Sequence, residues 1–296
     1  MDPALLGGLA ALASAASWAL GTVLWQQIGD VLSPLSINLN KCLIGIVYLA
    51  IVLPFVKLSA VDLRTFLCLG ISGVLGIALA DTFFFASLVA LGSKNASVIG
   101  TLAPVFTALG AVAFLGERPS LAVWIGIGLT SCGVLAVLWE RASTPATGAV
   151  RASGLKYALL SLLCMTAAVL LAKRGVAAVS PLEGTLIRLA WAAGAMLLWT
   201  LLRRKAAATL APWRQPGLFK KLWFVVFVGT FGGFWLSLVA LKLVDASVAT
   251  TLNSTTPLFV LPLAATILKE HISWRAVAGA VVAVSGVAAI FMAGGW

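Results

Sequence analysis

The sequence is poor in charged residues. Of its 296 residues only 10% are charged, and Asp and Glu together number nine. A soluble domain carries about a quarter charged residues, so this chain has too little polar surface to cover a water-soluble globule. Lipid is therefore the expected solvent for most of its surface.

The sequence also lacks the usual signatures of catalysis and metal binding. It has a single histidine, His271, and contains no His-Glu-x-x-His pair, no Gly-x-Ser-x-Gly elbow and no phosphate-binding loop. Its four cysteines share no metal-ligand spacing. An enzyme needs a nucleophile or a metal set with a base in reach. We therefore expect no enzymatic activity, no metal and no cofactor.

Hydrophobic residues, in contrast, make up 61% of the chain. A membrane span needs about 20 mostly apolar residues, and the sequence accommodates ten such windows: 5–27, 34–56, 65–89, 95–115, 120–139, 153–172, 181–202, 219–241, 246–268 and 274–293. The net charge of +11 comes from Lys and Arg scattered in the short loops between these windows, where such residues set orientation. This distribution predicts an all-α, multi-pass membrane protein that binds no nucleic acid.

The chain repeats itself at an offset of 153 residues. The residue pairs related by this offset are Pro104 and Pro257, Phe106 and Phe259, Glu117 and Glu270, Ser120 and Ser273, Gly126 and Gly279, and Gly133 and Gly286. We interpret this as an internal duplication, with halves at 1–139 and 153–296 and a small, polar linker at 140–152. Each half holds five windows, and an odd number would invert the second copy in the membrane, with a substrate site near the midplane between the copies.

Two embedded cations occupy matching positions in the halves. Ser33-Pro34 and Ser180-Pro181 each begin a window, and Lys41 and Arg188 each follow their proline by seven residues. Cations inside a span are costly and mark functional sites. We expect both to line a cavity and bind an anionic group; the alternative is that each forms a structural pair or extends to the membrane interface.

The other candidate substrate contacts are polar or aromatic residues within the windows. Asp81 is either a proton-coupling carboxylate or a counter-ion for Lys41 or Lys94. Asn253 belongs to the polar run 250–256, which either binds substrate or hydrogen-bonds within the helices. The complete set of expected substrate-binding residues is Trp18, Thr22, Asn38, Lys41, Tyr48, Asp81, Phe85, Thr101, Arg188, Trp235 and Asn253. We expect Glu117 and Glu270 to be structural and to hold the turns at which they lie.

The duplicated segments PVFTALGAVAFLGERPSLAVWIGIGLTSCGV and PLFVLPLAATILKEHISWRAVAGAVVAVSGV carry a family resemblance. With them the chain resembles two-repeat EamA-domain proteins of the drug/metabolite transporter superfamily. The resemblance covers nearly the whole chain and implies ten helices around a central cavity, with export or exchange of small metabolites such as amino acids.

Together these patterns predict a secondary-active transporter of two inverted five-helix repeats. We expect it to export small metabolites, such as amino acids or related compounds, by alternating access, with protons as a candidate coupling ion. We expect a monomer or homodimer in a bacterial inner (plasma) membrane. Two alternatives remain: an antiporter for organic-anion or phosphorylated metabolites, and a non-transporting membrane scaffold subunit. A wide cavity between the halves would argue against the scaffold.

Overall fold

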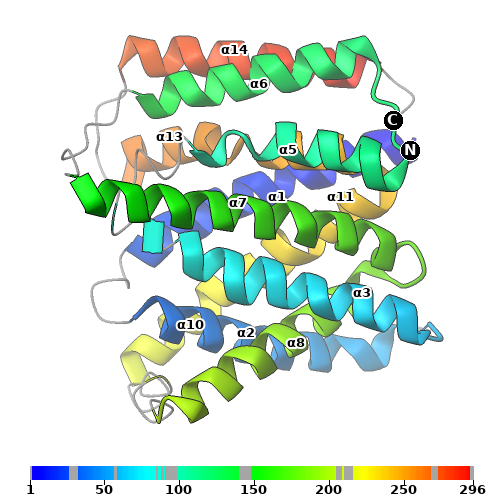
Figure 1. Cartoon of the computed structure of the whole chain (residues 1–296), viewed down its shortest axis with the longest axis vertical. Coiled ribbons are helices and arrows are strands. Elements are labelled where there is room, and N and C mark those ends of the chain that lie inside the picture. The colour runs from blue at the N-terminus through cyan, green and yellow to red at the C-terminus, as the bar shows by residue number, and fades with distance from the viewer. Residues whose placement is uncertain are drawn as a thin grey trace.

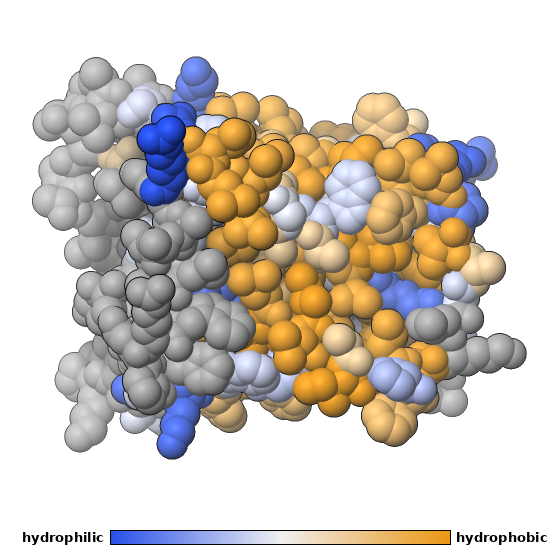
Figure 2. Space-filling model, turned by 90° about the horizontal axis from the view of Figure 1, so that it is seen from below, coloured by the Kyte–Doolittle hydropathy of each residue, from blue (hydrophilic) through white to orange (hydrophobic). Residues whose placement is uncertain are grey.

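In the computed structural model, the described part of the chain is built from helices joined by short turns (Figure 1). The structure describes residues 2–26, 33–56, 59–84, 86–87, 90, 99–139, 148–204, 209, 216–267 and 273–293. Alpha helix α1 begins, and α14 ends, at the same end of the bundle (Figure 1). The face seen in Figure 2 is mostly hydrophobic across its middle, with hydrophilic residues toward both ends, as a lipid-facing surface would be.

The elements of the first half are α1 (Pro3–Gln26), α2 (Pro34–Val52) with the short turn η1 (Leu53–Phe55), α3 (Leu63–Gly73) continued by the π-helix η2 (Val74–Ala80), α5 (Ala103–Gly110) continued by the π-helix η3 (Ala111–Leu115), and α6 (Leu121–Trp139). Those of the second half are α7 (Gly148–Val176), α8 (Pro181–Leu202), the continuous run of α10 (Pro216–Phe227), π-helix η5 (Val228–Trp235) and α11 (Leu236–Leu243), then α12 (Ala246–Asn253), α13 (Thr256–Ile267) and α14 (Trp274–Ala293). Helix α7 thus starts inside the expected linker 140–152.

Among the described residues, seven helical segments are long and apolar enough to cross a membrane, so the ten expected spans are not all confirmed. The seven are Pro3–Gly21, Leu35–Phe55, Leu63–Phe84, Ser153–Val176, Pro181–Leu202, Lys220–Leu243 and Trp274–Ala293. The segments Ala103–Leu115 and Leu121–Val137 are apolar but shorter. The predicted window 246–268 is broken into α12 and α13, because its polar run and Pro257 interrupt the helical hydrogen bonds. The described fold is therefore an all-helical, multi-pass membrane protein, as expected in outline.

Serine and proline begin two helices in the way that the sequence suggests. The Ser33 hydroxyl accepts a hydrogen bond from Ser36 N at the start of α2, and the Ser180 hydroxyl accepts one from Glu183 N at the start of α8. Pro34 and Pro181 follow in the first turn, where a missing N–H costs nothing. These caps fix where α2 and α8 start, and so fix the depth of the cations that follow.

Helices α6 and α14 pack against each other along the repeated glycines, at one edge of the bundle (Figure 1). A methyl group on Gly133 would lie 2.6 Å from Gly279 O, and one on Gly286 would lie 2.7 Å from Gly126 O. Gly126 therefore faces Gly286 while Gly133 faces Gly279, so the two helices run antiparallel. This close backbone approach is possible only without side chains at the contact.

The buried apolar residues form clusters that draw on both halves. One contains Ile127 of α6, Leu238 of α11 and Leu252 of α12, and another contains Leu39 of α2 and Leu189 of α8. The halves are thus packed into one another rather than standing apart.

A set of polar contacts ties the halves together at the end of the bundle where α1 begins. We call them the terminal network. The Glu117 carboxylate accepts hydrogen bonds from Ala246 N (2.6 Å), Ser247 N (3.3 Å) and Ser247 Oγ (2.8 Å), at the start of α12. The Glu183 carboxylate accepts from Ser59 N at 2.6 Å and from Ser59 Oγ at 3.0 Å. Glu117 is structural, but it joins the two halves instead of holding its own turn; Glu270 lies outside the described residues.

Two lysines of the second half add contacts between its own helices at the same end of the bundle. Lys173 Nζ donates to Val244 O at 2.5 Å and Lys242 Nζ donates to Val179 O at 2.7 Å. Burial, followed by the negative charge of Glu117, raises the pKa of Asp245, and the positive charge of Lys173 opposes this shift. This end of the bundle is therefore held closed by polar contacts across the helices.

Candidate functional site

Two helices break at positions related by the 153-residue offset. In the first half, Leu102 N donates to Ile99 O (3.1 Å) in a turn that precedes α5. In the second, Thr255 N donates to Leu252 O (3.2 Å) in a turn that precedes α13. Each break comes immediately before the repeated proline, Pro104 or Pro257. Non-helical backbone at membrane depth is tolerated where it lines a cavity or is buried in protein.

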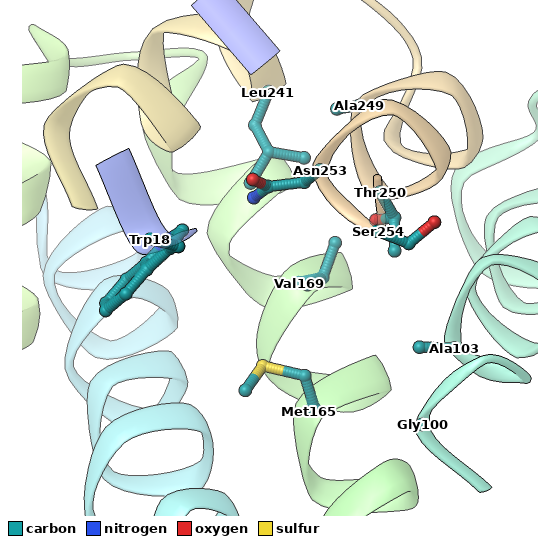
Figure 3. A pocket seen from close by; sticks show the side chains of 10 residues that line it. All are labelled: Trp18, Gly100, Ala103, Met165, Val169, Leu241, Ala249, Thr250, Asn253 and Ser254. Atoms are coloured by element: carbon teal, nitrogen blue, oxygen red, sulfur yellow. The ribbon is translucent and has the colours of Figure 1, made fainter. Parts of the chain in front are cut away.

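A cavity of about 250 Å³ lies at these breaks. It is lined by α1, the turn before α5, α7, α11, α12 and the turn after α12, through Trp18, Gly100, Ala103, Met165, Val169, Leu241, Ala249, Thr250, Asn253 and Ser254. Figure 3 shows Trp18 on one side of this pocket, Gly100 and Ala103 on the other, and Met165 and Val169 of α7 between them. The pocket is therefore bounded by residues from both halves of the chain.

The pocket combines an apolar lining with a polar edge from the second break. Asn253 Nδ2 donates to Ser237 Oγ at 3.2 Å, whereas the buried Asn253 Oδ1 has no hydrogen-bond partner among the described residues. Ser254 Oγ donates to Thr251 O at 2.7 Å. A buried amide oxygen without a donor is unfavourable, so Asn253, a residue of the pocket lining, carries an unsatisfied acceptor in the described part of the chain.

Trp18 forms the opposite wall and contacts the second half. Its ring meets that of Phe234 edge-on, with the ring centroids 4.9 Å apart. Phe234 lies in η5, one of the π-helical segments, which occur often at functional sites. Trp18 and Asn253 are thus the two predicted site residues that line this pocket.

A charged cluster lies beside the pocket. Lys41 Nζ and Asp81 Oδ2 form an ion pair at 3.1 Å, with 10% and 25% of their side chains exposed. Arg188 is 7% exposed, and Asp81 acts on it electrostatically. Asp81 is therefore a counter-ion for Lys41, one of the roles considered from the sequence. Lys94 lies outside the described residues.

Two contacts connect the cluster to the pocket. Lys41 Nζ lies 5.1 Å from the centroid of the Phe234 ring, which also contacts Trp18. A methyl group on Gly76 would lie 3.4 Å from Arg188 Nη2 and 4.0 Å from the Met165 sulfur. Phe234 and Gly76 thus each neighbour both the charged cluster and a residue of the pocket lining.

The remaining predicted residues have other surroundings. Asn38 Nδ2 donates to Ile77 O at 2.6 Å, and Tyr48 OH donates to Trp223 O at 3.0 Å. Trp235 packs edge-on against Phe231, with the ring centroids 6.4 Å apart. Thr101 is buried in the turn before α5, next to the pocket residue Gly100. These four side chains do not line the pocket, and Phe85 and the side chain of Thr22 lie outside the described residues.

Most of the pocket lining is not distinguishable in the sequence. Met165, Val169 and Leu241 have the same character as side chains that face lipid, so nothing in their type marks a cavity. Thr250 and Ser254 carried a usable signal, because they lie one turn apart and on the same helical face as Asn253. The expected substrate-binding residues include only Asn253 from this polar run.

The fold and the pocket together indicate a class of membrane protein. A multi-pass helical membrane protein with paired helix breaks around a pocket has the architecture of a solute transporter. A family model for the EamA-like transporter family matches residues 5–139 and again residues 152–292. The chain belongs to this family and is a membrane transporter of the drug/metabolite transporter superfamily.

The other comparisons add the fold but no substrate. No curated protein matches the chain. A crystal structure of a protein has a TM-score of 0.76 with this one at 17% sequence identity, over 98% of this chain and 97% of the other. At that identity the similarity shows a shared fold alone.

Proposed function

We propose that the protein is a secondary-active transporter that exports small metabolites, such as amino acids or related compounds, by alternating access. Its two halves, 1–139 and 153–296, form inverted five-helix repeats joined by 140–152. They move against each other around the pocket, in a bacterial inner membrane, as a monomer or homodimer. A proton gradient or the gradient of the solute itself drives the movement.

The observation that carries this proposal is the position of the pocket. It lies where two repeat-related helices break, and both halves contribute to its lining. Its volume of about 250 Å³ lies just below the roughly 300–1,000 Å³ of sites for drug-sized ligands. The size and the mixed lining suit a small solute with an apolar body and a hydrogen-bonding group. A scaffold protein would need no such cavity.

The α6–α14 contact supports the inverted arrangement. Gly126 faces Gly286 and Gly133 faces Gly279, and the offset of 153 residues turns each of these pairs into the other. Such an exchange is what a two-fold axis between antiparallel repeats produces. In the proposed mechanism, this pair of helices braces the halves while the remaining helices line the path.

The terminal network supports a conformation closed on one side. Glu117, Glu183 and Lys173 all bridge helices at the end where α1 begins. Alternating access requires such contacts to form on one side while the other is open, and to break when the pocket changes sides.

A second candidate is an antiporter for organic-anion or phosphorylated metabolites. The observation that favours it is the burial of Lys41 and Arg188 beside the pocket. The two candidates differ in the solute, and one assay distinguishes them.

The test is counterflow in proteoliposomes loaded with unlabelled amino acids or, in parallel, with organic acids and phosphorylated compounds. If the protein exports amino acids, a labelled amino acid should accumulate in a saturable way. In Asn253→Ala the half-saturation concentration should rise about tenfold, because roughly one good hydrogen bond is lost. The matched control is Ser285→Ala, whose exposed hydroxyl bonds its own helix at Val281 O. Accumulation of organic or phosphorylated anions alone would select the antiporter, and no accumulation of any solute would refute both.

A further inference from the structure

The charged cluster beside the pocket contains an unbalanced charge. Lys41 and Arg188 contribute two positive charges, whereas Asp81 contributes one negative charge. The other described acids, Asp2, Asp62, Glu117, Glu183 and Asp245, all lie at the end of the bundle where α1 begins. Within the described ranges, the cluster therefore has one positive charge without a counter-charge.

Arg188 is the member of the cluster that forms no ion pair with any residue in the described part of the chain. Asp81 Oδ2 pairs with Lys41 Nζ at 3.1 Å, and no ion pair between Asp81 and Arg188 is formed among the described residues. Arg188 Nε is buried without a hydrogen-bond acceptor in the described part of the chain. A guanidinium has five N–H donors that suit carboxylate and phosphate oxygens. A buried cation in this state favours an anion beside it.

Two glycines allow α3 and η2 to pack closely against Arg188. Gly73 and Gly76 of α3 and η2 pack directly against Arg188, and a side chain on Gly73 would overlap its backbone. A methyl group on Gly76 would lie 3.4 Å from Arg188 Nη2 and 4.0 Å from the sulfur of Met165, so this glycine neighbours both the guanidinium and a residue of the pocket lining. The Asp81 side chain, one-quarter exposed, shows that the cluster is not sealed.

We propose that a monoanionic group binds beside Arg188, at the junction of α2, η2 and α8, and supplies the negative charge that this cluster lacks. The anion is either the carboxylate of the transported solute, whose body occupies the pocket, or a free inorganic anion. The proposal rests on the transport function proposed above and adds the chemistry of one end of the solute. Since Lys41 belongs to the first half and Arg188 to the second, the bound anion also links the halves.

The experiment measures the melting temperature of the purified, full-length protein in detergent. The probes are chloride, acetate, leucine and leucinamide, at an ionic strength held constant with a bulky organic sulfonate. Leucine and leucinamide share the same apolar body, but only leucine carries a carboxylate. A ligand that binds the folded state raises the melting temperature in a saturable way.

The proposal predicts a saturable rise with at least one monoanion and none with leucinamide. Arg188→Gln should abolish the rise, and Arg188→Lys, which keeps the charge but not the planar fork, should weaken it about tenfold. Asp81→Asn should tighten anion binding about tenfold, because it removes a like charge next to the proposed anion, and a tenfold change corresponds to about one pKa unit of interaction. Arg203→Gln, at the exposed end of the same helix, is the control and should behave as wild type.

The outcomes distinguish the two sources of the anion, and they distinguish failure of the anion site from failure of the transport function. A rise with chloride indicates a free anion, and a rise with leucine or acetate but not chloride indicates a carboxylate of the solute. No saturable rise in wild type, or a rise that Arg188→Gln leaves intact, overturns the proposal. If Arg188→Gln does not fold, Asp81→Asn decides, since unchanged or weaker anion binding there also overturns it. If the counterflow of amino acids is the same in these variants as in wild type, the proposed transport function stands and only the anion site is refuted.

Discussion

The contact between Glu117 and α12 gives a direct measure of how strongly the halves are tied together. One carboxylate satisfies two backbone N–H groups and the Ser247 hydroxyl at the start of α12. Hydrogen bonds to a charged group contribute about 1.5–3 kcal/mol each, and the loss of a helix cap costs about 0.5–2 kcal/mol. These terms overlap, and removing Glu117 also relieves its repulsion of Asp245. We expect Glu117→Ala to cost about 3 kcal/mol and Glu117→Gln, which keeps one acceptor, about 1.5 kcal/mol.

Tryptophan fluorescence during heating in detergent measures this cost. One kcal/mol shifts the melting temperature of a chain of this size by about 2–4 °C, so Glu117→Ala should melt about 6 °C or more below wild type. Arg118→Gln, an exposed neighbour in the same turn, is the matched control and should change little. If Glu117→Ala melts with the control, the carboxylate does not hold α12 and the terminal network is not a stabilising element.

Two further predictions concern packing and titration. Gly133→Leu should lower the free energy of unfolding by about 1–3 kcal/mol or more, because the leucine side chain has no space against Gly279. Gly128→Leu, on the same helix, meets open space. Equal melting temperatures for the two variants would contradict the close contact between α6 and α14. Asp245→Asn should raise the melting temperature near pH 7, because burial and Glu117 raise the pKa of this carboxyl and so disfavour its charged form in the folded state. This rise in melting temperature should fade as the pH falls through the raised pKa, because Asp245 of the folded wild-type protein becomes protonated there. A rise that grows on acidification would contradict the raised pKa.

The sequence predicted those parts of the fold that depend on local backbone chemistry. Ser33-Pro34 and Ser180-Pro181 begin α2 and α8 at the expected residues. Each of these residues constrains its own stretch of chain, so its effect is visible without the rest of the structure. The number of full-length helices was not predictable in the same way, because hydropathy does not reveal where a polar run will break a span.

The site was only partly predictable, for a physical reason. In a soluble protein, a large apolar side chain is expected to be buried. In a membrane protein, side chains such as Leu241 and Val169 are equally suited to face lipid or to line a cavity. Trp18 and Asn253 were recognisable because they combine size or polarity with a position inside a span. The partner of Glu117 could not be predicted, because it lies 129 residues away and depends on how the halves pack.

The central claim is that the pocket at the paired helix breaks binds the solute and faces each side of the membrane in turn. The most direct measurement places one cysteine at Ser254, in a chain whose four native cysteines are replaced by serine, and labels it with a membrane-impermeant maleimide from either side of proteoliposomes. We expect labelling from both sides, slowed in each case by saturating transported solute. Labelling from one side only, or labelling that the solute does not slow, would contradict this claim.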